Sequence, residues 1–206
     1  MADITLYHMS PSRSLLVLWM LEEVGASYEV KLLSGAHDEQ REPGYLAVNP
    51  MGKVPALVDR GTIITEAAAI CAYLADAFPE AGLAVPIGTP ARGLYYKWLF
   101  FGPSCLEPAI LDRMLKREGA PRGALGWGDT DTTLGVVEAA LEKSPYLLGD
   151  RFTTPDLVIG GGLRWGIATG AVTSRPAFDA YLARIAERPA LKRSEERDRM
   201  EVARAA

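Results

Sequence analysis

The stretch Asn49-Pro50-Met51-Gly52-Lys53-Val54-Pro55-Ala56-Leu57 places a proline inside an apolar run. Proline has no N–H to donate to a strand ladder, so it belongs at bends and sheet edges. A cis bond between Val54 and Pro55, which an X–Pro pair adopts at modest cost, would turn the backbone sharply. The N–H and C=O of Val54 would then form a short free edge, to which a peptide-like ligand can pair by strand addition.

A helix is expected to begin at Thr65-Glu66, one β-hairpin after this bend. The first turn of a helix has free N–H groups and the positive end of the dipole, which suit a carboxylate. The carboxylate of Glu66 in turn suits an ammonium group. A small ligand with a peptide backbone, a carboxylate and an amine would satisfy both segments, and glutathione is such a ligand.

Length and composition limit the other classes of function. The chain has 206 residues, of which 49% are hydrophobic, so it should form one large or two small globular domains. A net charge of -4 argues against binding to nucleic acid or to anionic membranes. The apolar runs are much shorter than the ~20 residues of a membrane span. The two cysteines, Cys71 and Cys105, form no Cys-x-x-Cys pair, so no metal site is expected and the predicted location is cytoplasmic.

The hydrophobic pattern before residue 80 predicts a mixed α/β domain. Alternating residues indicate strands over 3–7 and 27–33, and the apolar run between them is typical of a buried helix that stops at Gly25. Strand, helix and strand form a parallel βαβ unit. Residues 54–58 and 62–64 are predicted to form two further strands, and residues 66–78 a helix.

Proline and glycine are dense between Pro79 and Pro90, which predicts a linker. Helices are expected at 92–117, bent or split by Pro103 and Pro108, and at 129–143, 153–169, 176–188 and from about 189 onward. The domains are therefore predicted as an α/β domain over residues 1–80, a linker over 81–90 and an all-helical domain over 91–206.

Three segments together resemble the cytosolic glutathione S-transferase family, over nearly the whole chain. The opening segment from Leu6 to Ser14 is similar to bacterial members related to the theta and beta classes, which points to a serine-type enzyme. The resemblance implies a thioredoxin-like N-terminal domain, an all-α C-terminal domain, glutathione as co-substrate, a small hydrophobic electrophile, a role in detoxification and a homodimer. The three segments are Asn49 to Leu57, Thr65 to Leu74 and Tyr146 to Asp156.

The third segment also has a purely mechanical interpretation. Thr153 and Asp156 have the spacing of a capping box, and Phe152 and Leu157 that of a hydrophobic staple. Pro155 lies in the first turn, where its missing N–H does no harm. We therefore expect Asp156 to stabilise the fold and to have no catalytic role.

Conjugation requires the thiol of glutathione as a thiolate, so the site must lower a thiol pKa from about 8.5. A hydroxyl that donates a hydrogen bond to sulfur at a helix N-terminus acts in that direction. The resemblance places this donor just after the first strand, where Ser12, Ser10, Tyr7 and Ser14 are candidates. Ser12 falls at the position of the theta-like serine, and Tyr7 falls near that of the tyrosine-type classes. Serines at 12 and 14 are equally suited to capping the following helix.

The resemblance also implies which residues bind the other parts of glutathione. Val54, positioned by Pro55, would pair with the cysteinyl unit, while Glu66 and the N–H of Ala67 would bind the γ-glutamyl end. The family usually has Ser or Thr where this chain has Ala67, a change that removes one contact worth about 1–2 kcal/mol. Candidates for the remaining contacts are Arg13 near sulfur and, at the glycyl carboxylate, Lys53 with one of His37, Asp38 or Gln40.

The sequence does not determine which reaction the chain catalyses. Isomerisation, dehalogenation or peroxide reduction with glutathione, or a binding protein without catalysis, would use the same motifs. The electrophile is expected to lie between the domains, against the first long helix of the second domain. Aromatic residues at helical spacing more often belong to a protein core than to a ligand site, so the substrate cannot be inferred from this segment. The residues on it are Tyr95, Trp98, Phe101, Ser104 and Glu107.

Overall fold

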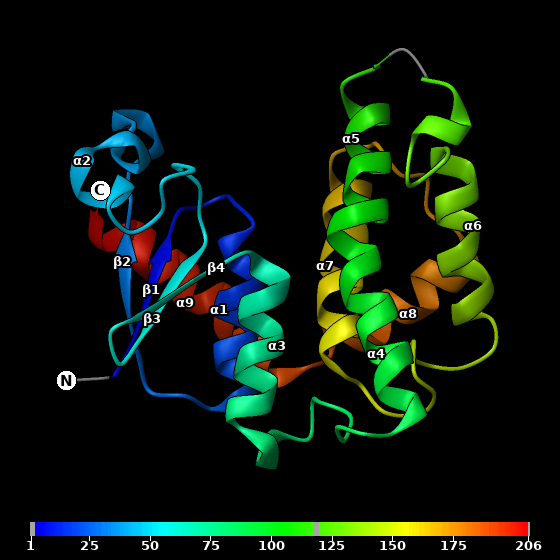
Figure 1. Ribbon diagram of the computed structural model, residues 1–206, viewed down its shortest axis with the longest axis horizontal. Coiled ribbons are helices and arrows are strands. Elements are labelled where there is room, and N and C mark those ends of the chain that lie inside the picture. The colour runs from blue at the N-terminus through cyan, green and yellow to red at the C-terminus, as the bar shows by residue number, and fades with distance from the viewer. Residues whose placement is uncertain (1–2, 118–119, 206) are drawn as a thin grey trace. The chain divides into compact units, whose positions relative to one another are not determined.

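The computed structural model describes residues 3–117 and 120–205, which form two compact units (Figure 1). The first unit contains the residues up to Ala81 together with those from Arg188 onward, and the second contains Gly82–Glu187. The predicted fold class is confirmed: the first unit is a thioredoxin-like α/β unit and the second is helical. No helix within the described ranges is long and apolar enough to cross a membrane.

A four-stranded sheet forms the centre of the first unit. The strands lie in the order β2-β1-β3-β4, with β1 parallel to β2 and antiparallel to β3, and β3 antiparallel to β4. Their bounds are β1 Ile4–His8, β2 Tyr28–Leu32, β3 Ala56–Asp59 and β4 Thr62–Thr65. All four strands predicted from the sequence are present, and β3 begins only after Pro55, which supplies no N–H to the ladder.

The register brings four chain segments to one edge of the sheet. Tyr7 pairs with Ala56, and Ala56 pairs with Thr65, so β1 ends, β3 begins and β4 ends side by side. His8 pairs with Leu32, so β2 ends at the same edge. The loops that follow or precede these residues are therefore neighbours in space.

Helix α1, Ser14–Val24, packs against β1 and against α3, Ala67–Ala77. The predicted buried helix is confirmed, and it ends at Gly25, whose φ of 66° lies in the left-handed region that glycine adopts without strain. Between β2 and β3 the chain forms only short turns of helix. These are η1 Gly35–His37, η2 Glu39–Arg41 and α2 Pro43–Leu46, and η3 Pro79–Ala81 follows α3.

The last helix, α9, Pro189–Ala205, packs on α1 and β2 of the first unit. From the sequence, this segment was expected to belong to the helical domain over 91–206, whereas in the structure it packs on the first unit. Two arginines of this segment form ion pairs with α1, which accounts for that position. Arg188 donates to both oxygens of Glu23 at 2.6 and 2.7 Å, and Arg193 donates to the carboxylate of Glu22 at 2.8 Å. Leu191 and Ser194 are buried on the same face of α9.

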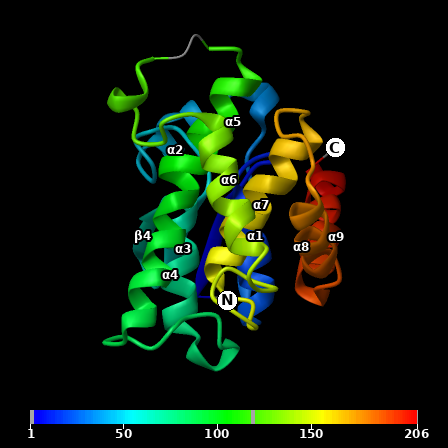
Figure 2. The ribbon, with the colours of Figure 1, turned by 90° about the vertical axis from the view of Figure 1, so that its right-hand side faces the viewer.

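The second unit is a bundle of helices (Figure 2). The predicted split of the first long helix is confirmed, because a π-helical turn, Gly102–Leu106, separates α4 from α5. A Cβ on Gly102 would lie 2.7 Å from Cγ1 of Val158, so glycine allows α7 to approach closely. The elements are α4 Pro90–Phe101, α5 Glu107–Met114, η5 Arg122–Ala124, α6 Thr130–Leu141, α7 Thr154–Ala168 and α8 Pro176–Ala186.

The start of α7 has the predicted capping box. The carboxylate of Asp156, fully buried, accepts from the backbone N–H of Thr153 at 2.9 Å and from that of Leu147 at 2.8 Å. The hydroxyl of Tyr181 donates to the same carboxylate at 3.1 Å. Burial raises the pKa of Asp156, and these hydrogen bonds oppose that rise. The group joins α7, α8 and the preceding turn.

Candidate functional site

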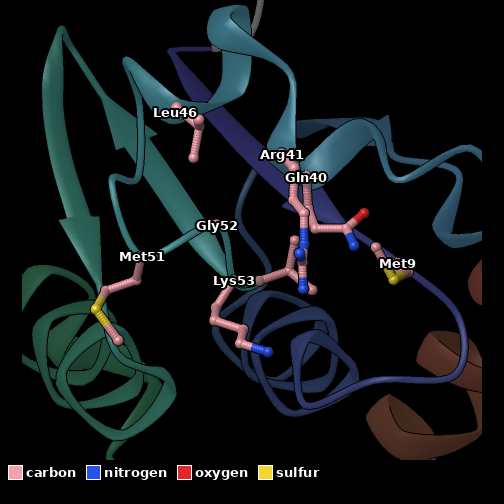
Figure 3. Close-up of a pocket in the computed structure, with 8 residues that line it drawn as sticks. Met9, Gln40, Arg41, Leu46, Met51, Gly52 and Lys53 are labelled. Atoms are coloured by element: carbon pink, nitrogen blue, oxygen red, sulfur yellow. The ribbon is translucent and has the colours of Figure 1, made fainter.

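A pocket of about 350 Å³ opens in the first unit, beside the sheet edge where the strand ends meet (Figure 3). Two cationic side chains, Arg41 and Lys53, extend from the loops that line it. Within residues 3–117 and 120–205, Lys53 forms no ion pair, and Arg41 reaches only Asp38, at 4.0 Å. The pocket is therefore suited to an anion. Its lining is Met9, Gln40, Arg41, Leu46, Met51, Gly52, Lys53 and Val54.

The loop before β3 is held by its own polar groups. The carbonyl of Lys53 accepts from the hydroxyl of Tyr45 at 2.6 Å and from the amide of Asn49 at 2.7 Å. Gly52 has a φ of 58°, and a Cβ there would lie 3.1 Å from the carbonyl of Gln40. The loop thus presents Lys53 and Val54 to the pocket in one fixed conformation.

The Val54-Pro55 peptide bond is cis. Among the described residues, no hydrogen bond outside the helices and strands involves the backbone of Val54. Because Val54 also lines the pocket, its N–H and C=O are available to pair with an extended ligand.

Glu66 precedes α3 with φ 70° and ψ 113°, a conformation that costs a non-glycine residue about 1–3 kcal/mol and recurs at binding sites. Its side chain is exposed. Within the described residues no side chain caps the helix, so the N–H groups of Ala67, Ala68 and Ala69 remain free of capping bonds. This helix start combines free donors with a positive dipole end and a carboxylate beside them.

The candidate hydroxyls lie in different surroundings. Tyr7 faces the side of the sheet opposite to His8, because side chains alternate along a strand. Its ring packs against Tyr45 at 5.3 Å between centroids, and its hydroxyl lies 3.4 Å from Nζ of Lys31. Tyr7 therefore occupies a packing position, away from the N-terminus of α1.

Ser12 lies at the N-terminus of α1 and is half-buried. Its Oγ accepts from the backbone N–H of Ser14 at 3.1 Å and lies 2.6 Å from Oγ of Ser14, which is fully buried. Ser10 donates to Oδ2 of Asp198 at 2.9 Å. Arg13 is exposed and precedes the first helical residue.

The structure adds two residues that the sequence reasoning missed, His8 and Asp198. His8 is fully buried, with Nδ1 2.7 Å from Oγ of Ser14 and Nε2 2.8 Å from Oδ1 of Asp198. A signal for His8 exists in the alternation of β1, where it follows Ile4 and Leu6 on the buried face. A signal for Asp198 exists in α9, where it lies four residues after the buried Ser194.

The two cysteines lie away from these loops. Cys71 is fully buried in α3, and burial raises the pKa of its thiol. Cys105 is half-buried in the π-helical turn. Over the described ranges, no three His, Cys, Asp or Glu side chains are grouped so that they could hold a metal ion.

The residues expected to line an electrophile site are divided between core and surface of the second unit. Tyr95 and Trp98 are buried in the core. Phe101 and Glu107 are half-buried, and Ser104 is exposed. The two largest aromatic residues thus serve the packing of α4.

Two family models match the chain. The N-terminal domain of glutathione S-transferases matches residues 2–76, and the C-terminal domain of the same family matches residues 128–189. Among curated relatives, glutathione S-transferase 3 of Zea mays is 31% identical, with 94% of each chain covered. Glutathione S-transferase GstA of Escherichia coli O157:H7 is 32% identical over 70% of this chain and 73% of its own.

Solved structures agree with these matches. A glutathione transferase homologue from Sulfitobacter, with glutathione bound, has a TM-score of 0.78 and 26% identity, and the match covers 96% of this chain and 99% of the other. BphK, a bacterial glutathione transferase solved as a ternary complex, has a TM-score of 0.78 and 29% identity, with coverage of 92% and 96%.

Proposed function

The chain belongs to the glutathione S-transferase family, and on that premise we propose that it activates the thiol of glutathione as a thiolate through Ser12, for attack on a small hydrophobic electrophile. The observation that carries the proposal is the convergence of Ser12, Val54 and Glu66 at one edge of the sheet, which follows from the pairing of Tyr7, Ala56 and Thr65.

The three parts of glutathione fit three parts of this edge. The cysteinyl unit pairs with the backbone of Val54, in the manner of strand addition. The γ-glutamyl carboxylate binds the free N–H groups at the start of α3, and its ammonium binds Glu66. Ala67 contributes its N–H but no hydroxyl.

The glycyl carboxylate is assigned to the cationic pocket. Lys53 and Arg41 supply the charge, and the amide of Gln40 lies beside them. Of the three alternatives considered with Lys53, only Gln40 lines this pocket, since His37 instead bonds to Ser34 at 3.0 Å. Arg41 is an addition that the sequence reasoning did not make.

Ser12 is the best-placed donor to sulfur for two reasons. It lies at the N-terminus of α1, where the helix dipole favours a negative charge. Its hydroxyl is half-buried, whereas that of Ser10 is directed to Asp198 and Tyr7 faces the other side of the sheet. Arg13, exposed beside Ser12, adds positive potential near the thiolate.

We extend the proposal to a homodimer, which is the assembly that the family resemblance implies. Helix α4 carries an exposed aromatic pair, Tyr96 and Phe100, which are 41% and 68% exposed and lie one turn apart on one face. Leu94, 56% exposed, lies on another side of the same helix. A patch of this kind on a soluble chain is typical of a protein–protein interface. Light scattering after size exclusion would measure a mass of two chains, and Phe100→Glu would reduce it to one.

The function is tested by titrating bound glutathione. Thiolate absorbs in the ultraviolet, so its pH midpoint on the enzyme reports activation directly. We expect a midpoint well below the value of about 8.5 for a free thiol. Ser12→Ala should return the midpoint toward that value and abolish most turnover, while glutathione is still retained. A wild-type midpoint equal to that of free glutathione would indicate a binding protein without catalysis.

A further inference from the structure

Four side chains form a continuous hydrogen-bonded chain within the first unit. Oγ of Ser12 lies 2.6 Å from Oγ of Ser14, which lies 2.7 Å from Nδ1 of His8. Nε2 of His8 lies 2.8 Å from Oδ1 of Asp198. The chain begins at the half-buried hydroxyl where we place the glutathione sulfur and ends on α9. We propose that His8, paired with Asp198, receives the proton of the glutathione thiol through Ser14 and Ser12, an inference that rests on the proposed function.

The direction of each bond follows from the carboxylate at its end. A carboxylate accepts hydrogen bonds only, so Nε2 of His8 carries a hydrogen and donates it to Asp198. In a neutral imidazole the other nitrogen is then an acceptor, so the hydroxyl of Ser14 donates to Nδ1. The carbonyl of Met9, at 3.2 Å from Oγ of Ser14, is the competing acceptor for that hydrogen, and Nδ1 of His8 is the closer of the two. Ser14 has no second hydrogen, so the hydroxyl of Ser12 donates to Ser14. In this state Ser12 offers a lone pair, and no hydrogen, to an arriving thiol.

The proton transfer balances without any further reactant. The thiol S–H bond breaks and its proton bonds to Oγ of Ser12. The hydrogen of Ser12 moves to Ser14, and that of Ser14 moves to Nδ1 of His8. One S–H bond and two O–H bonds break, while two O–H bonds and one N–H bond form. Neutral thiol and neutral imidazole become a thiolate and an imidazolium, and the carboxylate of Asp198 stays ionised.

The product state has the geometry that thiolate stabilisation requires. All three bonds have reversed, so Ser12 now donates to the sulfur anion and accepts from Ser14. The hydrogens of Ser12, Ser14 and the imidazole of His8 each have an acceptor within the chain or on the sulfur, both before and after the transfer. In both states Ser12 also accepts from the backbone N–H of Ser14 at 3.1 Å, and Ser14 from that of Met9 at 3.1 Å. The transfer therefore requires no movement of heavy atoms.

Asp198 is the charge that faces the imidazolium. Its side chain is 17% exposed, and its second oxygen accepts from Ser10 at 2.9 Å, so both oxygens have partners. Oδ1 of Asp198 lies 2.8 Å from Nε2 of His8, so the positive charge that the transfer leaves on the imidazole faces a carboxylate. The geometry is that of a base held by an orienting carboxylate.

Most other charged groups on the packed elements are engaged elsewhere or exposed. Four acidic side chains on α1 and α9 pair with arginines, while Glu195 on α9 is half-buried. On β2, Glu29 is exposed and Lys31 contacts Tyr7 on the opposite face of the sheet. In α3 the fully buried thiol of Cys71 is held protonated, because burial raises its pKa. The pairs are Glu22 with Arg193, Glu23 with Arg188, Glu196 with Arg199, and Glu201 with Arg197 and Arg204.

The test measures the pH titration of the thiolate of bound glutathione in three variants of the full chain. Asp198→Asn removes the charge and keeps the shape, His8→Gln removes the base, and Ser14→Ala interrupts the chain. Each should raise the midpoint by about one pH unit or more, which is tenfold less thiolate at a fixed pH below it. Turnover should fall in parallel at neutral pH and recover as the pH rises.

Glu196→Gln is the matched control. It removes the same charge from the same helix two residues away, where the carboxylate is exposed and pairs with Arg199. Its midpoint should equal that of the wild type. A purely structural role for the chain predicts a different result: lower melting temperatures and lower turnover at every pH, with an unchanged midpoint. That pattern would overturn the inference.

The two proposals fail in different ways. A wild-type midpoint equal to that of free glutathione removes the proposed function. A low wild-type midpoint that rises in Ser12→Ala but stays unchanged in both Asp198→Asn and Ser14→Ala leaves the function intact and removes the role of His8. If Asp198→Asn does not fold, the thiolate midpoint of Ser14→Ala tests the role of His8 instead. That variant keeps the contact between His8 and α9.

Discussion

Arg188 donates two hydrogen bonds to the carboxylate of Glu23, from Nε to one oxygen at 2.6 Å and from Nη2 to the other at 2.7 Å. The side chain of Glu23 is 6% exposed and that of Arg188 is 26% exposed. This pair joins the end of α1 to the start of α9, two segments that are far apart in the sequence.

The first prediction concerns this pair. Glu23→Gln leaves a partly buried guanidinium with a neutral partner, so the free energy of unfolding should fall by about 1–3 kcal/mol. Chemical denaturation measures the loss. Glu196→Gln, in an exposed pair on α9, is the control and should change stability little. An equal effect of both substitutions would mean that the Glu23 pair contributes no more than a surface contact.

Asp156→Ala should destabilise the chain more strongly than the loss of an ordinary helix cap. It removes the acceptor for Leu147, Thr153 and Tyr181 at a fully buried position, with an expected loss of about 2–4 kcal/mol in the free energy of unfolding. Asp129, the half-buried N-cap of α6, is the comparison, and Asp129→Ala should reduce the free energy of unfolding by less. A melting temperature of Asp156→Ala equal to that of the wild type would contradict the structural role.

The pH dependence of stability should include Asp59. The guanidinium of Arg60, and then the hydroxyl of Tyr73, hold the pKa of this buried carboxyl below its ordinary value. A folded-state pKa below the unfolded one means that unfolding takes up a proton at acid pH. The stabilisation is therefore complete above the unfolded pKa of about 4 and is lost as the pH falls through the lower folded pKa.

Tyr73→Phe tests this directly. The variant should be less stable than the wild type at pH 7. The difference should narrow as the pH falls from about 4 through the lower folded-state pKa of Asp59, below which the carboxyl is protonated in both the folded and the unfolded state. Denaturation curves at several pH values provide the measurement. A difference independent of pH would assign the effect to packing of the hydroxyl rather than to the charge of Asp59.

Thiol labelling should distinguish the two cysteines. Cys71 is fully buried with a raised pKa, so it should react only after unfolding, whereas Cys105 is half-buried and should react in the native protein. A colorimetric disulfide reagent should count one thiol in the folded chain and two in denaturant. Cys105→Ser should abolish the native signal, and a remaining native signal would show that α3 opens.

The assignment of the glycyl carboxylate is tested by comparing two ligands. Lys53→Met should weaken binding of glutathione by about fivefold to tenfold, since it removes a charge-assisted hydrogen bond. It should leave binding of γ-glutamylcysteine, which lacks the glycine, nearly unchanged. Calorimetry measures both affinities, and Lys143→Met, an exposed lysine on the second unit, is the control. Equal weakening for both ligands would place Lys53 at another part of the tripeptide.

Local signals in the sequence were sufficient for most of the fold. Gly25 ended α1 as expected, Pro55 delayed β3, and the breakers around Pro103 divided the long helix, because each acts on the backbone of its own neighbours. The contacts of His8 with Asp198 could not be predicted in this way. They join β1 to α9, and only the packing of α9 on α1 brings the two together.

The residues proposed to bind glutathione also divide into those that local sequence signals indicated and those that depend on tertiary contacts. Lys53 and Val54 line one pocket because they are neighbours in the chain, and the cis bond at Pro55 was suggested by the misplaced proline. Arg41 was missed because it lies in a short helical turn, η2, and lines the pocket beside residues from a different loop, Gly52 to Val54. The proposal of Ser12 over Tyr7 and Ser10 draws on contacts of the other two hydroxyls, with Lys31 and Asp198, which are tertiary.

The return of α9 to the first unit makes that unit discontinuous in the sequence, with the whole helical unit inserted before its last element. During synthesis on a ribosome, the sheet and every predicted contact to glutathione are made long before Asp198 emerges. A chain terminated before Arg188 would thus contain every residue proposed to contact glutathione, and would lack both the carboxylate that faces His8 and the helix that packs on α1.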